Sequence, residues 1–285
     1  MPSRSPAPPP RARCFVTPFG AAVACAAAAV VLLVLVAVRW SPLMAADLSV
    51  ARALHRRAVT EPGLVHVNRI LTDWVWDPWT MRALIAVAVV ALWWRGERVL
   101  AGWVAVTSVL CAVLQQGLKS AVGRQRPRWP DPVDSAHYAA FPSGHAMTAM
   151  VSCALLLWLL RRSGPGRPVW RAALAVAVVS VVGVGVTRLY LGVHWMSDVL
   201  GGWLLGAALA GFCVAEFDRY ERRGRYEGVF RKWRRPPEGR GPRRLVRCIA
   251  RRRGVLVRGV RGRSRRRGEA PCQTPRAGRD FRNTP

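Results

Sequence analysis

The chain has 285 residues, 52% of them hydrophobic, and its 44 lysines and arginines against 15 acidic residues give a formal charge of +29 at pH 7. An evenly mixed soluble globule would not combine so apolar a sequence with so strong a charge, so the apolar and basic residues must occupy different parts of the chain. The composition therefore argues against an ordinary cytosolic domain, a disulfide scaffold and a wholly disordered chain.

Apolar segments recur along the first three quarters of the chain, each near the roughly 20 residues that a helix needs to cross the hydrocarbon of a bilayer. Backbone groups find no water there, so helices are the expected spanning form. The sequence thus predicts an all-α fold, a six-span transmembrane helical bundle. The expected spans are residues 19–38, 78–94, 99–118, 146–160, 169–187 and 199–215.

The segments outside these spans complete the expected organisation. Residues 1–16 form a short N-terminal tail and residues 17–215 the membrane domain. The connection 39–76 carries apolar residues among charges, which favours short amphipathic helices at the water–lipid boundary. Asp77 is an expected N-cap for the second span because its carboxylate can accept a bond from the first helical turn.

Residues 216–285 are expected to form a disordered basic tail. They hold 24 basic residues against seven acidic ones, and so carry +17 of the +29. We expect this tail to lie along anionic lipids of the inner leaflet. Arginine clusters also bind nucleic acid, but no folded nucleic-acid reader is recognisable, so that partner is not expected.

Arginines collect mainly on the side of the membrane that holds the N-terminus. By the positive-inside rule this side is cytoplasmic, and six spans return the C-terminus to it. The outer side then holds residues 39–77, 119–145 and 188–198. The sequence predicts a multi-pass plasma-membrane protein with both termini in the cytoplasm.

Two histidines are expected at the outer ends of spans. His145 begins the fourth span, and His194 begins the sixth. Asp198 stands four residues after His194, so on a helix the carboxylate can accept from one imidazole nitrogen and leave the other free to attack. His145 would then donate a proton to the leaving oxygen.

Fixed positive charge is expected around these histidines. Lys119, Arg126 and Arg188 lie at the same outer ends, where they would bind the nonbridging oxygens of a phosphate. Ser143 and Gly144 immediately precede the fourth span, so a hydroxyl and a helix N-terminus would face the same anion. The pattern therefore predicts a phosphate site.

The residues in this order resemble the three-part signature of the type 2 phosphatidic acid phosphatase (PAP2) superfamily, which includes bacterial lipid phosphatases and undecaprenyl pyrophosphate phosphatases. The resemblance covers roughly residues 40 to 215. The matching motifs are Lys119-x6-Arg126-Pro127, Pro142-Ser143-Gly144-His145 and Arg188-x5-His194-x3-Asp198.

The resemblance implies a role for each motif residue: His194 forms a phosphohistidine intermediate, Asp198 is its partner and His145 is the general acid. It implies phosphate binding by Lys119, Arg126, Ser143, Gly144 and Arg188. No metal and no cofactor is expected. The sequence departs from the family at Thr187, where a serine is usual, although threonine keeps the hydroxyl.

Several polar residues nearby have no place in the signature. Arg124 and Arg128 are interpreted either as headgroup contacts or as solvated charges. His55, His66 and His137 are interpreted as incidental.

The expected function is an integral membrane phosphatase that acts on a lipid-linked phosphate or pyrophosphate at the outer face, with a polyprenyl pyrophosphate favoured. The alternative within this class is a phosphatidate or phosphatidylglycerophosphate phosphatase. A third hypothesis, of another class, is a non-catalytic membrane anchor whose basic tail recruits acidic partners. The sequence indicates neither the choice between monophosphate and diphosphate nor the oligomeric state.

Overall fold

A computed structural model describes the backbone of residues 17–234 and the side chains of residues 17–224. All regular structure in this described part is helical, as the sequence predicts. The helices are α1 (Pro18–Ala37), α2 (Ser41–Ala58), α3 (Pro62–Ile70), the π-helix η1 (Leu71–Val75), α4 (Pro78–Trp94), α5 (Arg98–Val122), α6 (Gly144–Arg162), α7 (Arg167–Tyr190) and α8 (Met196–Arg234).

The expected six spans are confirmed. Within the described residues, six helical stretches are long and apolar enough to cross a membrane, and α3, η1 and α4 together count as one of them. Many large apolar side chains on these helices are exposed, including Val30, Val87 and Val179. A soluble protein would bury such a continuous apolar surface, whereas a bilayer covers it. The chain therefore has the organisation of a multi-pass membrane protein.

Local signals fix several helix ends. The Asp77 carboxylate accepts a hydrogen bond of 2.6 Å from the Trp79 backbone N–H, which confirms the expected N-cap of α4. Gly123 ends α5 in the left-handed region, at φ 58°, where a side chain would be strained. This glycine sends the chain into the long loop 123–143 between α5 and α6.

The main core lies among α4, α5, α6 and α8. It is built from Ile85, Leu100, Val104, Cys111, Met147, Val151, Leu155 and Phe217. α8 also contacts α1, where Phe19 and Phe212 meet edge to face at 5.6 Å, and α7, where the Trp203 indole donates to the Val181 carbonyl at 3.1 Å. α8 is therefore packed against most of the bundle.

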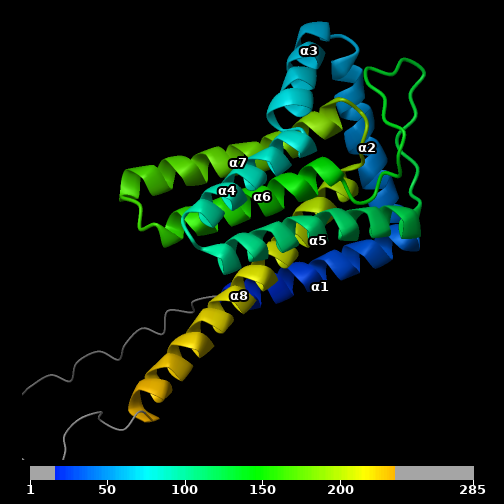
Figure 1. Cartoon of the computed structure of the whole chain (residues 1–285). Coiled ribbons are helices and arrows are strands. Elements are labelled where there is room, and N and C mark those ends of the chain that lie inside the picture. The colour runs from blue at the N-terminus through cyan, green and yellow to red at the C-terminus, as the bar shows by residue number, and fades with distance from the viewer. Residues whose placement is uncertain (1–16, 235–285) are drawn as a thin grey trace, which may run out of the picture. The chain divides into compact units, whose positions relative to one another are not determined.

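The connection 39–76 is helical, as expected, and its helices gather at one end of the bundle. Figure 1 shows α2 lying across the end at which the loop 123–143 leaves α5, with α3 nearby. A small apolar cluster of Ala58, Val65, Leu191 and Val193 joins α2 and α3 to the turn between α7 and α8. These helices thus form one wall of the region around the motif residues. Their place at the water–lipid boundary stays a prediction.

The expected start of a disordered tail at residue 216 is wrong for residues 216–234, because α8 continues through them. Phe217 is buried, and its ring meets Trp103 and Trp158 edge to face. The Arg162 guanidinium at the end of α6 also forms two hydrogen bonds, of 2.5 and 3.1 Å, with Glu221. Tertiary contacts of this kind stabilise a helix beyond its apolar stretch. Residues 1–16 and 235–285, with the expected tails, lie outside the described part.

Candidate active site

His194 lies in the turn between α7 and α8, two residues before α8 begins. The expectation that His194 and Asp198 share one helical face is therefore wrong, yet the two side chains do meet. Asp198 lies in the first turn of α8. Its Oδ2 accepts a hydrogen bond of 2.9 Å from the Trp195 backbone N–H, as in a capping box. The same oxygen lies 3.4 Å from His194 Nδ1. Helix capping thus places the carboxylate against the imidazole.

The other ring nitrogen of His194 faces a cation. Arg126 Nη1 lies 3.1 Å from His194 Nε2. A guanidinium can only donate, so Nε2 must accept and the ring proton must reside on Nδ1, facing Asp198. This tautomer leaves the lone pair of Nε2 on the side of the ring where the cations gather.

Burial holds His194 in its neutral form. Only 1% of the residue is exposed, and this desolvation, followed by the charges of Arg126, Arg188 and Lys119, lowers the pKa of His194 well below 6.5. At neutral pH the imidazole is therefore a free base.

Arg126 is fixed by the loop 123–143 and by the turn before α8. Its Nε donates to the Tyr138 carbonyl and its Nη1 to the Val193 carbonyl, both at 2.6 Å. Two indoles tie the loop to the turn: Trp129 donates to the Gly192 carbonyl at 3.0 Å, and Trp195 donates to the Gln125 carbonyl at 2.9 Å. The loop is thus held over His194.

The N-terminus of α6 brings the second motif to the same place. The Ser143 backbone N–H donates to the Asp198 carbonyl at 2.9 Å. The residue is fully buried, yet its Oγ has no hydrogen-bond partner among the described residues. A Cβ on Gly144 would lie 2.5 Å from Nε2 of Gln115 on α5, so the Gln115 side chain packs directly against the start of α6. His145 is half-buried and within electrostatic range of His194, Arg188, Lys119 and Arg126.

Arg188 and Lys119 complete the cationic surroundings. Arg188 is 5% exposed; its Nη1 donates to Thr72 Oγ1 at 3.3 Å, and its Nε has no partner among the described residues. Lys119, in the last turn of α5, lines a cavity of about 260 Å³ together with Tyr138. Two buried donors without partners, Ser143 Oγ and Arg188 Nε, are costly unless a ligand accepts from them. The site is therefore suited to an anion.

The interpretation of Arg124 as a headgroup contact or solvated charge is wrong. It is largely buried and forms ion pairs with Asp198, at 2.6 Å, and with Asp47 of α2, at 2.7 Å. Arg128, two residues from Arg126, is exposed. Asp47 was not recognised from the sequence, although it is the only acidic residue of α2 and so stood out on a helix that otherwise carries basic ones.

Other polar residues of the region have local roles. The Thr187 hydroxyl donates to the Val184 carbonyl of its own helix at 2.8 Å, so it serves α7. His55 is stacked on Trp129, with ring centroids 4.1 Å apart, and helps to hold the loop 123–143 against α2. Within the described residues, no three His, Cys, Asp or Glu side chains are grouped as metal ligands.

Comparison with known proteins places this chain in a family. The PAP2 superfamily model matches residues 98–221. Decaprenylphosphoryl-5-phosphoribose phosphatase of Mycobacterium tuberculosis is 33% identical over 168 residues, which are 57% of this chain and 86% of that protein. This chain belongs to the PAP2 superfamily. The family resemblance predicted from the sequence is thereby confirmed.

Other PAP2 relatives match over shorter parts. Phosphatidylglycerophosphatase B of Bacillus subtilis is 36% identical over 114 residues, covering 40% of this chain and 55% of that protein. Undecaprenyl-diphosphatase of Sulfolobus acidocaldarius is 28% identical over 153 residues, covering 50% and 64%. The matches thus span less than two thirds of these two relatives.

The fold of this PAP2 chain is also that of a solved relative. The crystal structure of a transmembrane PAP2-type phosphatidylglycerolphosphate phosphatase from Bacillus subtilis superimposes with a TM-score of 0.61 at 25% identity, covering 72% of this chain and 98% of that one.

Proposed function

We propose that this chain is an integral membrane phosphatase that hydrolyses a lipid-linked phosphate or pyrophosphate, with a polyprenyl pyrophosphate as the favoured substrate. The observation that carries the proposal is the neutral, buried His194, whose Nε2 faces Arg126 in a region with two unpartnered buried donors. A nucleophile, its orienting carboxylate and an anion site are the parts that phosphoryl transfer needs.

In this proposal the transferring phosphoryl group binds among the cations. Arg126, Arg188 and Lys119 neutralise its nonbridging oxygens, and the Ser143 hydroxyl and the N-terminus of α6 at Gly144 donate hydrogen bonds. Arg126 then exchanges its contact with His194 for one with phosphate. That exchange frees the lone pair of Nε2 for attack.

The reaction proceeds in two steps. His194 Nε2 forms a bond to phosphorus as the bond from phosphorus to the leaving oxygen breaks. His145, which carries a proton once the bound phosphate anion offsets the surrounding cations, donates that proton to the leaving oxygen. Asp198 stabilises the charge that develops on the ring through its contact with Nδ1. Water then attacks the phosphohistidine, His145 accepts its proton, and inorganic phosphate leaves with His194 restored.

The relatives support a lipid-linked substrate. Two of the three are named for polyprenyl-linked phosphates, undecaprenyl diphosphate and decaprenylphosphoryl-5-phosphoribose, which favours a polyprenyl chain. Phosphatidylglycerophosphatase B supports the alternative, a phosphatidylglycerophosphate or phosphatidate phosphatase.

The distribution of arginines supports an active site on the outer face with both termini in the cytoplasm. In that orientation the basic residues after 235 face the anionic lipids of the inner leaflet. A non-catalytic anchor that recruits acidic partners through these residues is the remaining alternative. It offers no reason for a buried neutral histidine beside unpartnered donors.

The test is phosphate release by the purified protein in detergent with EDTA, from a polyprenyl pyrophosphate, a polyprenyl monophosphate, phosphatidate and phosphatidylglycerophosphate. We expect the wild type to act on at least one, with the polyprenyl pyrophosphate hydrolysed fastest. His194→Ala should lose at least about 10³-fold in kcat and all acid-labile phosphoenzyme, because no other group replaces the nucleophile.

His137→Ala is the matched control, since this histidine is exposed in the loop 123–143, and it should retain wild-type turnover. Phosphate release that persists in His194→Ala would show that the nucleophile is wrong. A folded wild type inactive on all four lipids would contradict the enzyme itself.

A further inference from the structure

A buried ionic cluster lies directly behind the candidate nucleophile and includes a helix outside the family motifs. Asp47 of α2 is 1% exposed. Its Oδ2 accepts hydrogen bonds from Arg124 Nη2, at 2.7 Å, and from Ser197 Oγ, at 2.5 Å. Its Oδ1 accepts a hydrogen bond of 2.9 Å from the Ser197 backbone N–H. α2 is thereby bonded to the first turn of α8.

Arg124 connects this aspartate to the one beside His194. Its Nη1 donates to Asp198 Oδ1 and to Ser197 Oγ, both at 2.6 Å. Both oxygens of Asp198 are then occupied, because Oδ2 serves the Trp195 backbone N–H and His194 Nδ1. The carboxylate cannot rotate without breaking a charge-assisted bond to the guanidinium.

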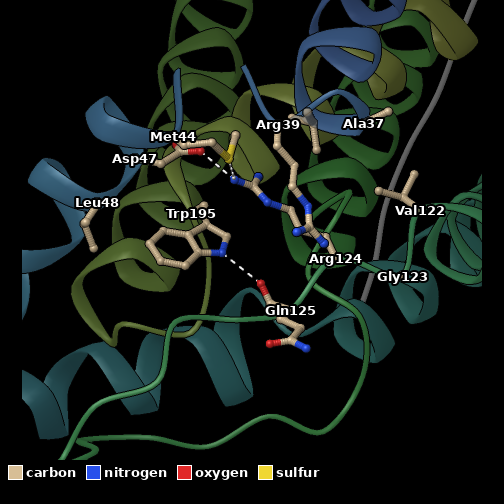
Figure 2. A pocket seen from close by; sticks show the side chains of 11 residues that line it. Ala37, Arg39, Met44, Asp47, Leu48, Val122, Gly123, Arg124, Gln125 and Trp195 are labelled. Atoms are coloured by element: carbon tan, nitrogen blue, oxygen red, sulfur yellow. Dashed lines mark hydrogen bonds and ion pairs between the residues drawn. The ribbon is translucent and has the colours of Figure 1, made fainter. Parts of the chain in front are cut away.

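Packing alone does not explain these charges. Two carboxylates share one guanidinium, and burying such a group costs more than packing apolar residues of similar volume. The cluster also borders a cavity of about 540 Å³, lined by Asp47, Arg124, Met44 and Trp195 among others (Figure 2).

We propose that Asp47 and Arg124 are positioning residues for the nucleophile, which act through Asp198 to hold the His194 imidazole with its proton on Nδ1 and its Nε2 toward the phosphate. α2 thus contributes to catalysis without touching the substrate. This inference rests on the proposed function.

The mechanism of positioning follows from the geometry. If Asp47 loses its charge, Arg124 keeps only one of its two anionic partners, and its hold on Asp198 Oδ1 loosens. Asp198 can then turn away from Nδ1, so a smaller fraction of His194 carries its proton there and presents Nε2 correctly. Phosphate binding, which uses other side chains, stays intact.

The first test is Asp47→Asn, which keeps the size and one acceptor oxygen of the side chain. We expect kcat to fall about 10- to 100-fold, by analogy with the loss of outer partners that orient metal-ligating histidines. KM for the lipid should stay unchanged, and the formation of phosphohistidine in a single turnover should slow by the same factor as kcat. A structural role alone would lower the amount of folded protein and leave these rates per folded molecule unchanged.

Two matched controls accompany this variant. Ser49→Ala changes an exposed side chain of α2, and Arg128→Gln changes an exposed arginine near Arg124. Both should leave kcat at the wild-type value. A wild-type kcat in folded Asp47→Asn would overturn the inference.

Two further variants decide the question if Asp47→Asn does not fold. Ser197→Ala removes only the hydroxyl that joins Arg124 to Asp47, and it should lower kcat in the same way. Arg124→Ala should be partly restored by added guanidinium ion, for which the cavity of about 540 Å³ has ample room. Full activity of Ser197→Ala together with no response of Arg124→Ala to guanidinium would overturn the inference.

These outcomes separate the inference from the function on which it rests. An active wild type with an inactive His194→Ala and an unaffected Asp47→Asn rejects the positioning role alone. A wild type inactive on every lipid rejects the proposed function, and the inference falls with it.

Discussion

The protonation of His194 is decided by its immediate surroundings. The residue is almost wholly buried, and one ring nitrogen faces Arg126 while the other faces Asp198. Desolvation and the nearby cations oppose a positive ring more strongly than a backbone hydrogen bond at Ala140 favours it, so the pKa of His194 lies well below 6.5. The surroundings that keep the imidazole neutral also mean that protonating it lowers the free energy of unfolding.

A dependence of stability on pH results from this shift. Above pH 6.5 His194 is neutral in both the folded and unfolded states, so it adds no pH dependence. Below pH 6.5 the unfolded chain binds a proton that the folded protein does not, and the free energy of unfolding falls by up to about 1.4 kcal/mol per pH unit. The fall continues until the pH reaches the folded-state pKa.

The measurement is the thermal unfolding midpoint of the wild type and of His194→Asn in detergent between pH 8 and pH 5. The midpoint of the wild type minus that of the variant should be constant above pH 6.5 and should decrease below it. The variant is the control for every other titrating group. A difference that stays level or increases toward pH 5 would mean that His194 takes up a proton in the folded protein.

At the scale of helices, the approach of α8 to the start of α6 sets the spacing of the site. A Cβ on Gly202 would lie 2.7 Å from the Ser143 carbonyl oxygen and 3.0 Å from Ala146 Cβ. Backbone cannot yield as the end of a flexible side chain can. Glycine at 202 therefore lets Asp198, in α8, and Ser143, the residue before α6, lie close enough for the Ser143 backbone N–H to donate to the Asp198 carbonyl.

Gly202→Ala should destabilise the protein by about 1 to 3 kcal/mol, the usual cost of overpacking a tight contact. It should also lower kcat, because the added methyl group would push the start of α6, with Ser143 and His145, away from His194. Unfolding midpoints and phosphate release measure the two effects. Gly117→Ala is the control: nothing lies within 4 Å of its Cβ position on α5, so this helix should be as stable or more stable. A fully stable Gly202→Ala would contradict the close contact.

At the scale of the whole molecule, the helical bundle includes more of the chain than its six apolar spans. The motif residues and the cluster behind them all lie between residues 47 and 198. α8 nevertheless belongs to the bundle beyond its apolar stretch, because Phe217 is in the main core and Glu221 pairs with Arg162. The boundary of the catalytic unit is therefore expected after α8 and not at residue 215.

Two truncations test this boundary. A chain ending at Arg234 should keep the kcat and KM of the full chain in detergent, since it retains every contact described above. A chain ending at Ala215 should lose stability, because removing a buried phenylalanine typically costs about 3 to 5 kcal/mol. Phosphate release and thermal unfolding of both chains provide the check. Loss of turnover in the chain that ends at Arg234 would contradict this boundary, because residues beyond α8 would then be needed for catalysis.

The sequence alone determined the six spans, the N-cap at Asp77 and the family, because hydropathy, capping and motif spacing are properties of neighbouring residues. It also predicted that His194 and Asp198 meet, which they do, although the reason given for their contact, a shared helical face, was wrong. Only the tertiary structure showed that Arg124 is paired and largely buried while Arg128 is exposed. In the sequence the two arginines lie in similar surroundings in one loop, and they differ only in what packs against them. The Arg124 partner Asp47 lies 77 residues away in the chain, and no local pattern encodes a contact that forms when α2 packs across the end of the bundle.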